Sequence, residues 1–186
     1  MITIDQERPC DDAEIENLLD AAFGPERFTK SSYVLRENLS ALPNLSHVAR
    51  KEGRLVGTIR YFPIQIQDLL AGQTQNALLL GPLAVSPTLH NEGVGSQLIT
   101  QTMQAARALG YKRILLVGDI TYYSRFGFES VLPRYITMPG GRDARRLLVW
   151  QAATISSLPA VGKLLAGWKK TAPARNWAAE DLQPAA

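Results

Sequence analysis

The sequence is short of cysteine, of long apolar runs and of an apolar start, and each shortage excludes a class of protein. Its one cysteine, Cys10, cannot form a disulfide within the chain, so we expect a protein of the reducing cytoplasm. No apolar run approaches the roughly 20 residues that span a bilayer, and the first residues lack the apolar core of a signal peptide. We therefore expect a soluble cytoplasmic protein without a membrane partner.

Concentrated charge of one sign is also missing. The 20 lysines and arginines against 17 acidic residues give a net charge of +3, and they form no dense basic stripe of the kind that binds nucleic acid. No cluster of histidine, cysteine and aspartate has the spacing of a metal site. Neither a nucleic acid nor a metal ion is implied, whereas the small positive excess would suit a polyanionic small molecule.

The length of 186 residues and the hydrophobic content of 46% fit one domain with a sizeable core. Alternating and helical apolar patterns follow one another along the chain, with glycine or proline at the turns between them. They predict a strand over residues 2–7, helices over 13–23 and 30–39, a hairpin of strands 48–50 and 55–66, a strand over 77–85, a helix over 93–109, and a last hairpin of 128–137 with 147–152. This order predicts an α/β fold without internal repeats.

The apolar strand over residues 77–85 contains an obstacle to regular pairing. Its nearly unbroken apolar run is typical of a strand covered on both faces. Pro82, however, donates no hydrogen bond to a neighbouring strand. A β-bulge at Gly81-Pro82 would reconcile the two observations.

The same strand leads into a glycine-containing turn and then a helix. Gly93 and Gly95 lack a Cβ, so backbone N–H groups there can approach a ligand closely, and the first turn of a helix has unpartnered N–H groups at a partly positive end. The arrangement predicts a site for a phosphate-sized anion. It is not a dinucleotide-binding turn, because Leu98 stands where a third glycine is needed, and not a P-loop, because no lysine lies between Lys51 and Lys112. A bare turn with only a helix-capping task is the alternative.

Two motifs follow one another along the chain, with this helix and a strand between them. The first reads His90-Asn91-Glu92-Gly93-Val94-Gly95 before Ser96, and the second places Tyr123 four residues before Gly127-Phe128. Both resemble the GNAT family of acyl-CoA-dependent N-acetyltransferases, whose phosphate loop reads Gln/Arg-x-x-Gly-x-Gly/Ala, and the segment around Gly118-Asp119 looks like a bacterial subgroup of predicted acetyltransferases. His90 departs from the family pattern. A neutral imidazole donates one hydrogen bond where arginine brings a permanent charge, which predicts weaker binding of a pyrophosphate.

The resemblance implies the GNAT-like acyl-CoA N-acyltransferase fold, a mixed, splayed sheet of about six to seven strands flanked by helices, with acetyl-CoA as cosubstrate. It places residues 90–96 on the diphosphate of coenzyme A. It also places Leu83, Ala84 and Val85 along the pantetheine arm, where a freed backbone N–H would polarise the thioester carbonyl. Ordinary strand pairing is the alternative for these three residues.

Acyl transfer to an amine calls for a base near the amine and an acid near the departing sulfur. Tyr123 is the candidate acid, because a phenol and a thiol have pKa values near 10 and 8.5. Asp119 is the nearest candidate base, acting through a water, because residues 76–85 contain no acid; capping the short helix that follows is the reading we favour for it. Phe28 and Tyr33 would line the acceptor pocket or, equally, pack in the core.

We divide the chain into a GNAT acetyltransferase domain over residues 1–152 and a C-terminal extension over residues 153–186. In the extension, residues 161–170 are amphipathic and would form a helix, a partner contact or a loose tail, and residues 171–186 are expected to be poorly ordered. The oligomeric state stays open, with a homodimer through the region of Trp168 as one option.

The predicted function is transfer of an acetyl group from acetyl-CoA to a primary amine of a small molecule or peptide, by direct attack in a ternary complex. A non-catalytic acyl-CoA-binding regulatory or sensor module is the alternative, favoured by the missing acid on the bulged strand and by His90. A protein-interaction domain with a decayed cofactor site is a third option.

Overall fold

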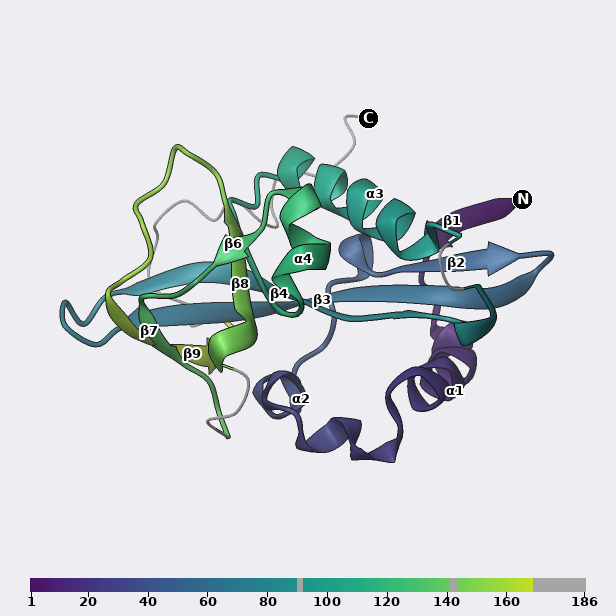
Figure 1. The fold of residues 1–186 in the computed structure, drawn as a ribbon, viewed down its shortest axis with the longest axis horizontal. Helices are drawn as coiled ribbons and strands as arrows, with labels where there is room; N and C mark the ends of the chain where they lie inside the picture. Colours follow the sequence, from purple (N-terminus) through teal and green to yellow (C-terminus); the bar gives the residue numbers. More distant parts are fainter. Residues whose placement is uncertain (90–91, 141–143, 169–186) are drawn as a thin grey trace, which may run out of the picture.

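The computed structural model describes residues 1–89, 92–140 and 144–168, and in them nine strands form one mixed sheet flanked by helices (Figure 1). The strands are β1 (Ile2–Gln6), β2 (His47–Lys51), β3 (Arg54–Asp68), β4 (Thr74–Val85), β5 (Arg113–Val117), β6 (Glu129–Ser130), β7 (Tyr135–Thr137), β8 (Leu147–Gln151) and β9 (Val161–Ala166). The helices are α1 (Asp12–Phe23), α2 (Ser31–Arg36), α3 (Val94–Ala108) and α4 (Ile120–Tyr123). The order across the sheet is β1-β2-β3-β4-β5-β8-β6, with β9 beside β3 and β7 beside β9.

The first half of the sheet is an antiparallel meander of β1 to β4 in chain order. In the turn between β2 and β3, Glu52 and Gly53 have φ of 53° and 79°, the backbone that a two-residue hairpin turn requires. The predicted hairpin is therefore confirmed, as is the predicted edge strand at the N-terminus. The predicted helix over residues 13–23 is also confirmed, and its backbone turns away at Gly24, where φ is 72°.

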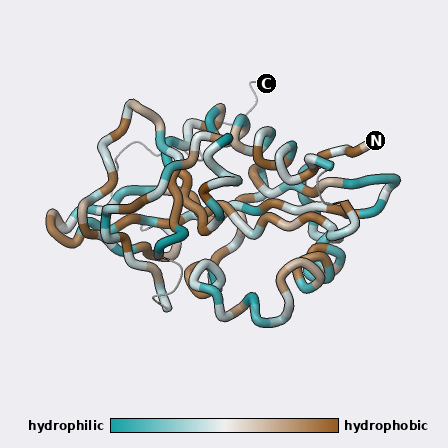
Figure 2. The backbone as a smooth tube through the Cα atoms, in the orientation of Figure 1, coloured by the Kyte–Doolittle hydropathy of each residue, from teal (hydrophilic) through white to brown (hydrophobic). Residues whose placement is uncertain are grey.

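Helices cover both faces of the sheet: α3 lies on one face, and α1 and α2 lie on the other (Figure 1). Successive side chains of β2 point to opposite faces of the sheet and so pack against both helical layers. Ala49 packs with Leu98 and Ile99 of α3, while its neighbour Val48 packs with Ile15 of α1. The most hydrophobic stretches lie along the central strands (Figure 2). Each fully buried leucine or isoleucine contributes roughly 1.5–3 kcal/mol, so this core fixes the register of the strands.

The two central strands part in the middle of the sheet. β4 and β5 pair only through Leu78 with Ile114 and Leu79 with Leu115. Just beyond, Leu83 and Leu80 of β4 stand opposite Ile59 and Tyr61 of β3, which leaves one extra residue on β4. The predicted bulge at Gly81-Pro82 is thus confirmed, and past it β4 and β5 diverge.

The predicted final hairpin is partly wrong. Only β6 pairs with β8, whereas β7 pairs with β9 in parallel. The chain turns at Leu132-Pro133, and Pro133 has no N–H to continue a ladder with β8. The segment from Tyr135 onward is therefore free to join another strand.

The helix that was one option for residues 161–170 is also wrong, because residues 161–166 form strand β9 beside β3. Gly162 and Leu164 are buried while Lys163 between them is exposed, which is the period of a strand. Trp168 follows, and its Nε1 donates a hydrogen bond to the carbonyl of Ala77 at 3.2 Å. The predicted tail, residues 171–186, lies outside the described residues. In the part of the chain that is described, no helix combines the length and the apolarity needed to cross a membrane.

Candidate active site

Three adjoining cavities surround the place where β4 and β5 part. The α3 pocket, of about 550 Å³, lies at the start of α3. The strand cleft, of about 310 Å³, lies between the ends of β4 and β5. The α1–α2 cavity, of about 910 Å³, lies between those helices and β3. Leu83 and Tyr122 line both the pocket and the cleft, and Tyr33 and Arg36 line both the cleft and the cavity, so the cleft adjoins the other two.

The α3 pocket is formed by backbone. Gly93 has φ of 76° at the start of α3, and among the described residues no side-chain cap is found for the N–H groups of the first turn. A Cβ on Gly95 would lie 3.0 Å from the hydroxyl of Tyr122 and 3.5 Å from Cγ2 of Val85, so glycine keeps this space open. Free N–H groups at the positive end of a helix of this length can bind a phosphate-sized anion.

Arg125 adds a cation to the same pocket. Its exposed guanidinium lies over the ring of Tyr122, 4.2 Å from the centroid, and its Nε donates to the carbonyl of that residue at 3.0 Å. It is therefore both a surface arginine and a lining residue of the pocket. Glu92, by contrast, turns its carboxylate to Lys51 at 2.8 Å and its N–H to the carbonyl of Leu89 at 3.3 Å. His90 and Asn91 lie outside the described residues.

The strand cleft exposes the backbone edge of β4. On the side that faces β5, residues 80–85 have no strand partner within the described part of the chain. This stretch contains Leu83, Ala84 and Val85, which all line the α3 pocket. An unpaired strand edge can bind amide groups of an extended ligand as an added strand would.

The ring of Tyr123 can lie in the cleft because Gly118 has no side chain to occupy that space. A Cβ on Gly118 would be 2.3 Å from Cε2 of the Tyr123 ring, which no side chain could tolerate. The ring packs edge-on against Phe128 and Tyr122, at centroid distances of 5.9 and 4.9 Å. Among the described residues, its hydroxyl makes no hydrogen bond. It is therefore available to a ligand in the cleft.

The Tyr123 phenol is a poor acid in this site. Burial raises its pKa well above the ordinary value for tyrosine, nearby Tyr122 adds to the rise, and Arg146 opposes it. The hydroxyl thus stays protonated at neutral pH and acts as a hydrogen-bond donor.

Asp119 has a structural task in the same region. As the N-cap of α4, its side chain accepts a hydrogen bond from the N–H of Thr121 at 2.9 Å. The carboxylate also lines the strand cleft, where it is the one acidic side chain in the described lining. The interpretation of Asp119 as the cap of the short helix is thus confirmed.

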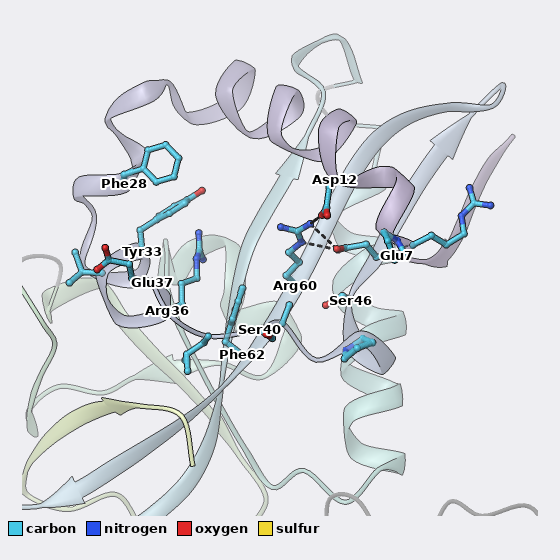
Figure 3. A pocket seen from close by; sticks show the side chains of 16 residues that line it. Glu7, Asp12, Phe28, Tyr33, Arg36, Glu37, Ser40, Ser46, Arg60 and Phe62 are labelled. Carbon is cyan, nitrogen blue, oxygen red and sulfur yellow. Dashed lines mark hydrogen bonds and ion pairs between the residues drawn. The ribbon is translucent and has the colours of Figure 1, made fainter. Parts of the chain in front are cut away.

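The α1–α2 cavity is formed by side chains (Figure 3). Phe28 and Tyr33 lie in its wall, and their role in an acceptor pocket stays a prediction. Arg60 is held by Glu7 through two contacts of 2.7 and 2.8 Å, and by Asp12 at 2.8 Å. Sequence reasoning missed Arg36, a buried cation of the same cavity, since nothing in the local sequence distinguishes it from a surface arginine on a short helix.

The described residues offer no metal centre, because no three of their histidine, cysteine or acidic side chains gather as ligands. What they do offer is a domain built around parted strands, with an anion site at a helix start beside an exposed strand edge.

Comparisons with known proteins place this architecture in a family. Residues 13–128 match the model of the acetyltransferase (GNAT) family. The uncharacterized N-acetyltransferase YjhQ of Escherichia coli strain K12 is 35% identical over 121 residues, which are 64% of this chain and 65% of YjhQ, just under two thirds of that relative. The uncharacterized N-acetyltransferase YhbS of the same strain is 31% identical over 124 residues, 66% of this chain and 71% of YhbS.

Solved structures agree. The crystal structure of YhbS in complex with CoA has a TM-score of 0.69 at 25% identity, covering 87% of this chain and 88% of that one. A GNAT acetyltransferase from Brucella melitensis in complex with acetyl-CoA has a TM-score of 0.63 at 27% identity, covering 86% and 93%. The chain belongs to the GNAT acetyltransferase family, and its sheet has the GNAT fold.

Proposed function

We propose that this protein is an N-acetyltransferase that moves an acetyl group from acetyl-CoA to a primary amine by direct attack in a ternary complex. The observation that carries the proposal is the set of three adjoining cavities, in which the strand cleft shares lining residues with an anion site and with a separate cavity. Two substrates can therefore meet at the cleft from opposite sides. The complexes of the YhbS and Brucella relatives with CoA and acetyl-CoA add support for the cosubstrate.

In this proposal the backbone of the chain holds the acyl donor. The N–H groups of residues 93–96 and the guanidinium of Arg125 bind its diphosphate. The free edge of residues 83–85 binds the amides of its pantetheine arm. An unpaired N–H at the bulge donates to the thioester oxygen and stabilises the negative charge that develops there.

Tyr123 then stabilises the leaving group. As the amine nitrogen bonds to the carbonyl carbon, the carbon–sulfur bond breaks and negative charge gathers on sulfur. The protonated phenol donates a hydrogen bond to that sulfur, which takes up a proton as the amide nitrogen loses one. Loss of one positioned hydrogen-bond donor to a developing negative charge costs roughly 10²–10³-fold in rate.

The amine must arrive without its proton. An alkylamine with a pKa near 10.4 is neutral at pH 7 in only about one molecule in 10³. The cations that line the cleft, Lys30, Arg36 and Arg146, favour the neutral amine over the ammonium. In this proposal Asp119 caps α4, and its role as a base through a water stays a prediction.

The test is thiol release from acetyl-CoA with a panel of primary amines, measured beside calorimetric binding of acetyl-CoA. We expect both binding and amine-dependent release. Binding without release by any amine would instead support the sensor module, and absence of binding would overturn both.

A further inference from the structure

Arg36 is a buried cation without a carboxylate partner, in contrast to the arginines around it. Its residue is 8% exposed, and its guanidinium lies over the ring of Tyr33 at 3.6 Å and near that of Phe62 at 5.3 Å. Arg27 is paired with Glu16 and Asp20, and Arg60 with Glu7 and Asp12. Within the described residues no acidic side chain pairs with Arg36, not even its neighbour Glu37. A buried guanidinium is costly to leave unpaired, so a ligand that supplies the missing charge would be favoured.

Arg36 is placed at the junction where the two substrates would meet. It lines both the strand cleft and the α1–α2 cavity, and Figure 3 shows it beside Tyr33 in the cavity wall. Its Nη1 lies 3.9 Å from the position that a Cβ on Gly81 would take, in the bulge of β4. A group bound to Arg36 would therefore lie close to the thioester of a donor held along β4.

The surroundings favour an anion. Lys30 and Arg146 also line the strand cleft, and the one acidic side chain in its described lining, Asp119, is used to cap α4. Burial lowers the pKa of Arg36 to about 10, the charge interaction and the side-chain hydrogen bond with Tyr33 oppose this fall, and the charges of Arg60 and Arg27 add to it. The guanidinium is thus still charged at neutral pH, and its charge is not neutralised by the protein.

We propose that the acceptor carries a carboxylate within a few bonds of its reactive amine, and that Arg36 binds this carboxylate. The planar guanidinium matches the two oxygens of a carboxylate, which fixes orientation as well as position. The aromatic walls formed by Phe28, Tyr33 and Phe62 would hold an apolar portion of the same molecule. The acceptor class is therefore free amino acids and their close analogues. This inference rests on the proposed acetyl transfer.

The first test compares matched acceptors: phenylalanine, phenylalaninamide and phenethylamine, and the same series built on alanine and on lysine. Values of kcat/KM are compared per concentration of neutral amine, because a neighbouring carboxylate raises the pKa of the amine. On this basis we expect wild-type kcat/KM for at least one free acid to exceed that for its amide by more than about tenfold, since loss of a buried ionic hydrogen bond is costly. Arg36→Met should lower kcat/KM for the acid about 10²-fold and abolish the preference over the amide. Arg36→Lys, which keeps the charge but not the fork, should retain part of it.

The control variant is Arg8→Met, which removes another cation from the same cavity. Arg8 has a 65% exposed side chain next to Asp11, so this variant should keep the preference for the acid. Thermal unfolding and acetyl-CoA affinity of Arg36→Met and Arg36→Lys separate loss of the carboxylate site from loss of the fold. Equal kcat/KM for acids and amides in the wild type, or a preference that survives Arg36→Met in a folded protein, would overturn the inference.

A binding measurement keeps the inference separate from the proposed function. With CoA saturating, calorimetry compares N-acetylphenylalanine with its carboxamide, neither of which can be acetylated at its nitrogen. Binding of the acid that is weakened at least about tenfold by Arg36→Met supports the carboxylate site even if no amine is turned over. Turnover of amines together with equal binding of acid and carboxamide supports the transfer reaction and overturns the carboxylate site.

Discussion

The donor side of the candidate site presents mainly backbone groups, whereas the acceptor side presents mainly side chains. On the donor side, the α3 pocket and the β4 edge present backbone groups, kept accessible by Gly93, Gly95 and the bulge. On the acceptor side, the α1–α2 cavity is shaped by the side chains of Tyr33, Arg36 and others. A backbone site depends on where the chain lacks side chains, whereas a side-chain site depends on which residues tertiary packing brings together. The donor side should therefore be sensitive to added atoms, and the acceptor side to changed chemistry.

The largest effect should come from filling the donor side. Gly95→Val adds a branched side chain where a Cβ alone would meet the hydroxyl of Tyr122 at 3.0 Å. We expect calorimetry to show acetyl-CoA binding weakened by about 10³-fold, roughly 4 kcal/mol. Gln97→Val, two residues further along α3 at an exposed position, is the matched control and should bind normally. Unchanged binding by Gly95→Val would contradict a backbone anion site.

The next effect separates binding from chemistry. Tyr123→Phe removes one hydroxyl from the strand cleft and no atom from the α3 pocket. We expect kcat to fall roughly 10–10³-fold while the Kd for acetyl-CoA changes little. Turnover at the wild-type rate would exclude the phenol as a donor to sulfur.

A related variant tests whether the small size of Gly118 sets the position of the Tyr123 ring. Gly118→Ala places a methyl group 2.3 Å from a ring carbon of Tyr123 and forces the ring to move. We expect kcat to fall about as far as in Tyr123→Phe, and the double variant to be little worse than either single one, because both remove the same contact. Fully additive losses would mean that Gly118 matters for another reason.

The pH dependence sharpens the acceptor side. The pKa of Arg36 is lowered to about 10 by burial, so its charge is lost at a lower pH than for an ordinary arginine. The preference in binding for N-acetylphenylalanine over its carboxamide, neither of which carries a titrating amine, should be constant from pH 6 to about 9 and decline as pH passes about 10. Arg36 is faced by Tyr33, Arg27 and Arg60, and the arginines bear the same charge throughout this range. A preference that instead falls as pH decreases from 9 to 7 would point to a different group.

The smallest catalytic effect is expected at Asp119. Asparagine caps helices about as well as aspartate does, so Asp119→Asn keeps the cap and removes the charge. We expect kcat to stay within about twofold. Asp119→Ala should cost about 1 kcal/mol of stability, measured by urea unfolding. A 10²-fold loss of kcat in Asp119→Asn would restore the carboxylate as the base.

The contrast between the backbone groups of the donor side and the side chains of the acceptor side also explains which features could be predicted from the sequence. The glycine turn and the bulge at Gly81-Pro82 follow from local patterns, because glycine and proline act on the backbone where they stand, whereas Tyr123 was singled out through the family resemblance. The burial of Arg36 does not, because it arises when α2 packs on Phe62 of β3, far along the chain. The number of strands was underestimated for a similar reason. β9 pairs with residues 64–68 of β3, beyond the segment that β2 covers, and β7 pairs with β9, so these pairings depend on residues far along the chain rather than on local sequence.

A crystal structure of the protein with acetyl-CoA tests the central claim most directly. The account predicts the diphosphate on the N–H groups of residues 93–96, the thioester carbonyl beside the β4 bulge, and the sulfur within hydrogen-bond distance of the Tyr123 hydroxyl. A donor bound elsewhere, or a sulfur turned away from Tyr123 with β4 and β5 closed together, would contradict it.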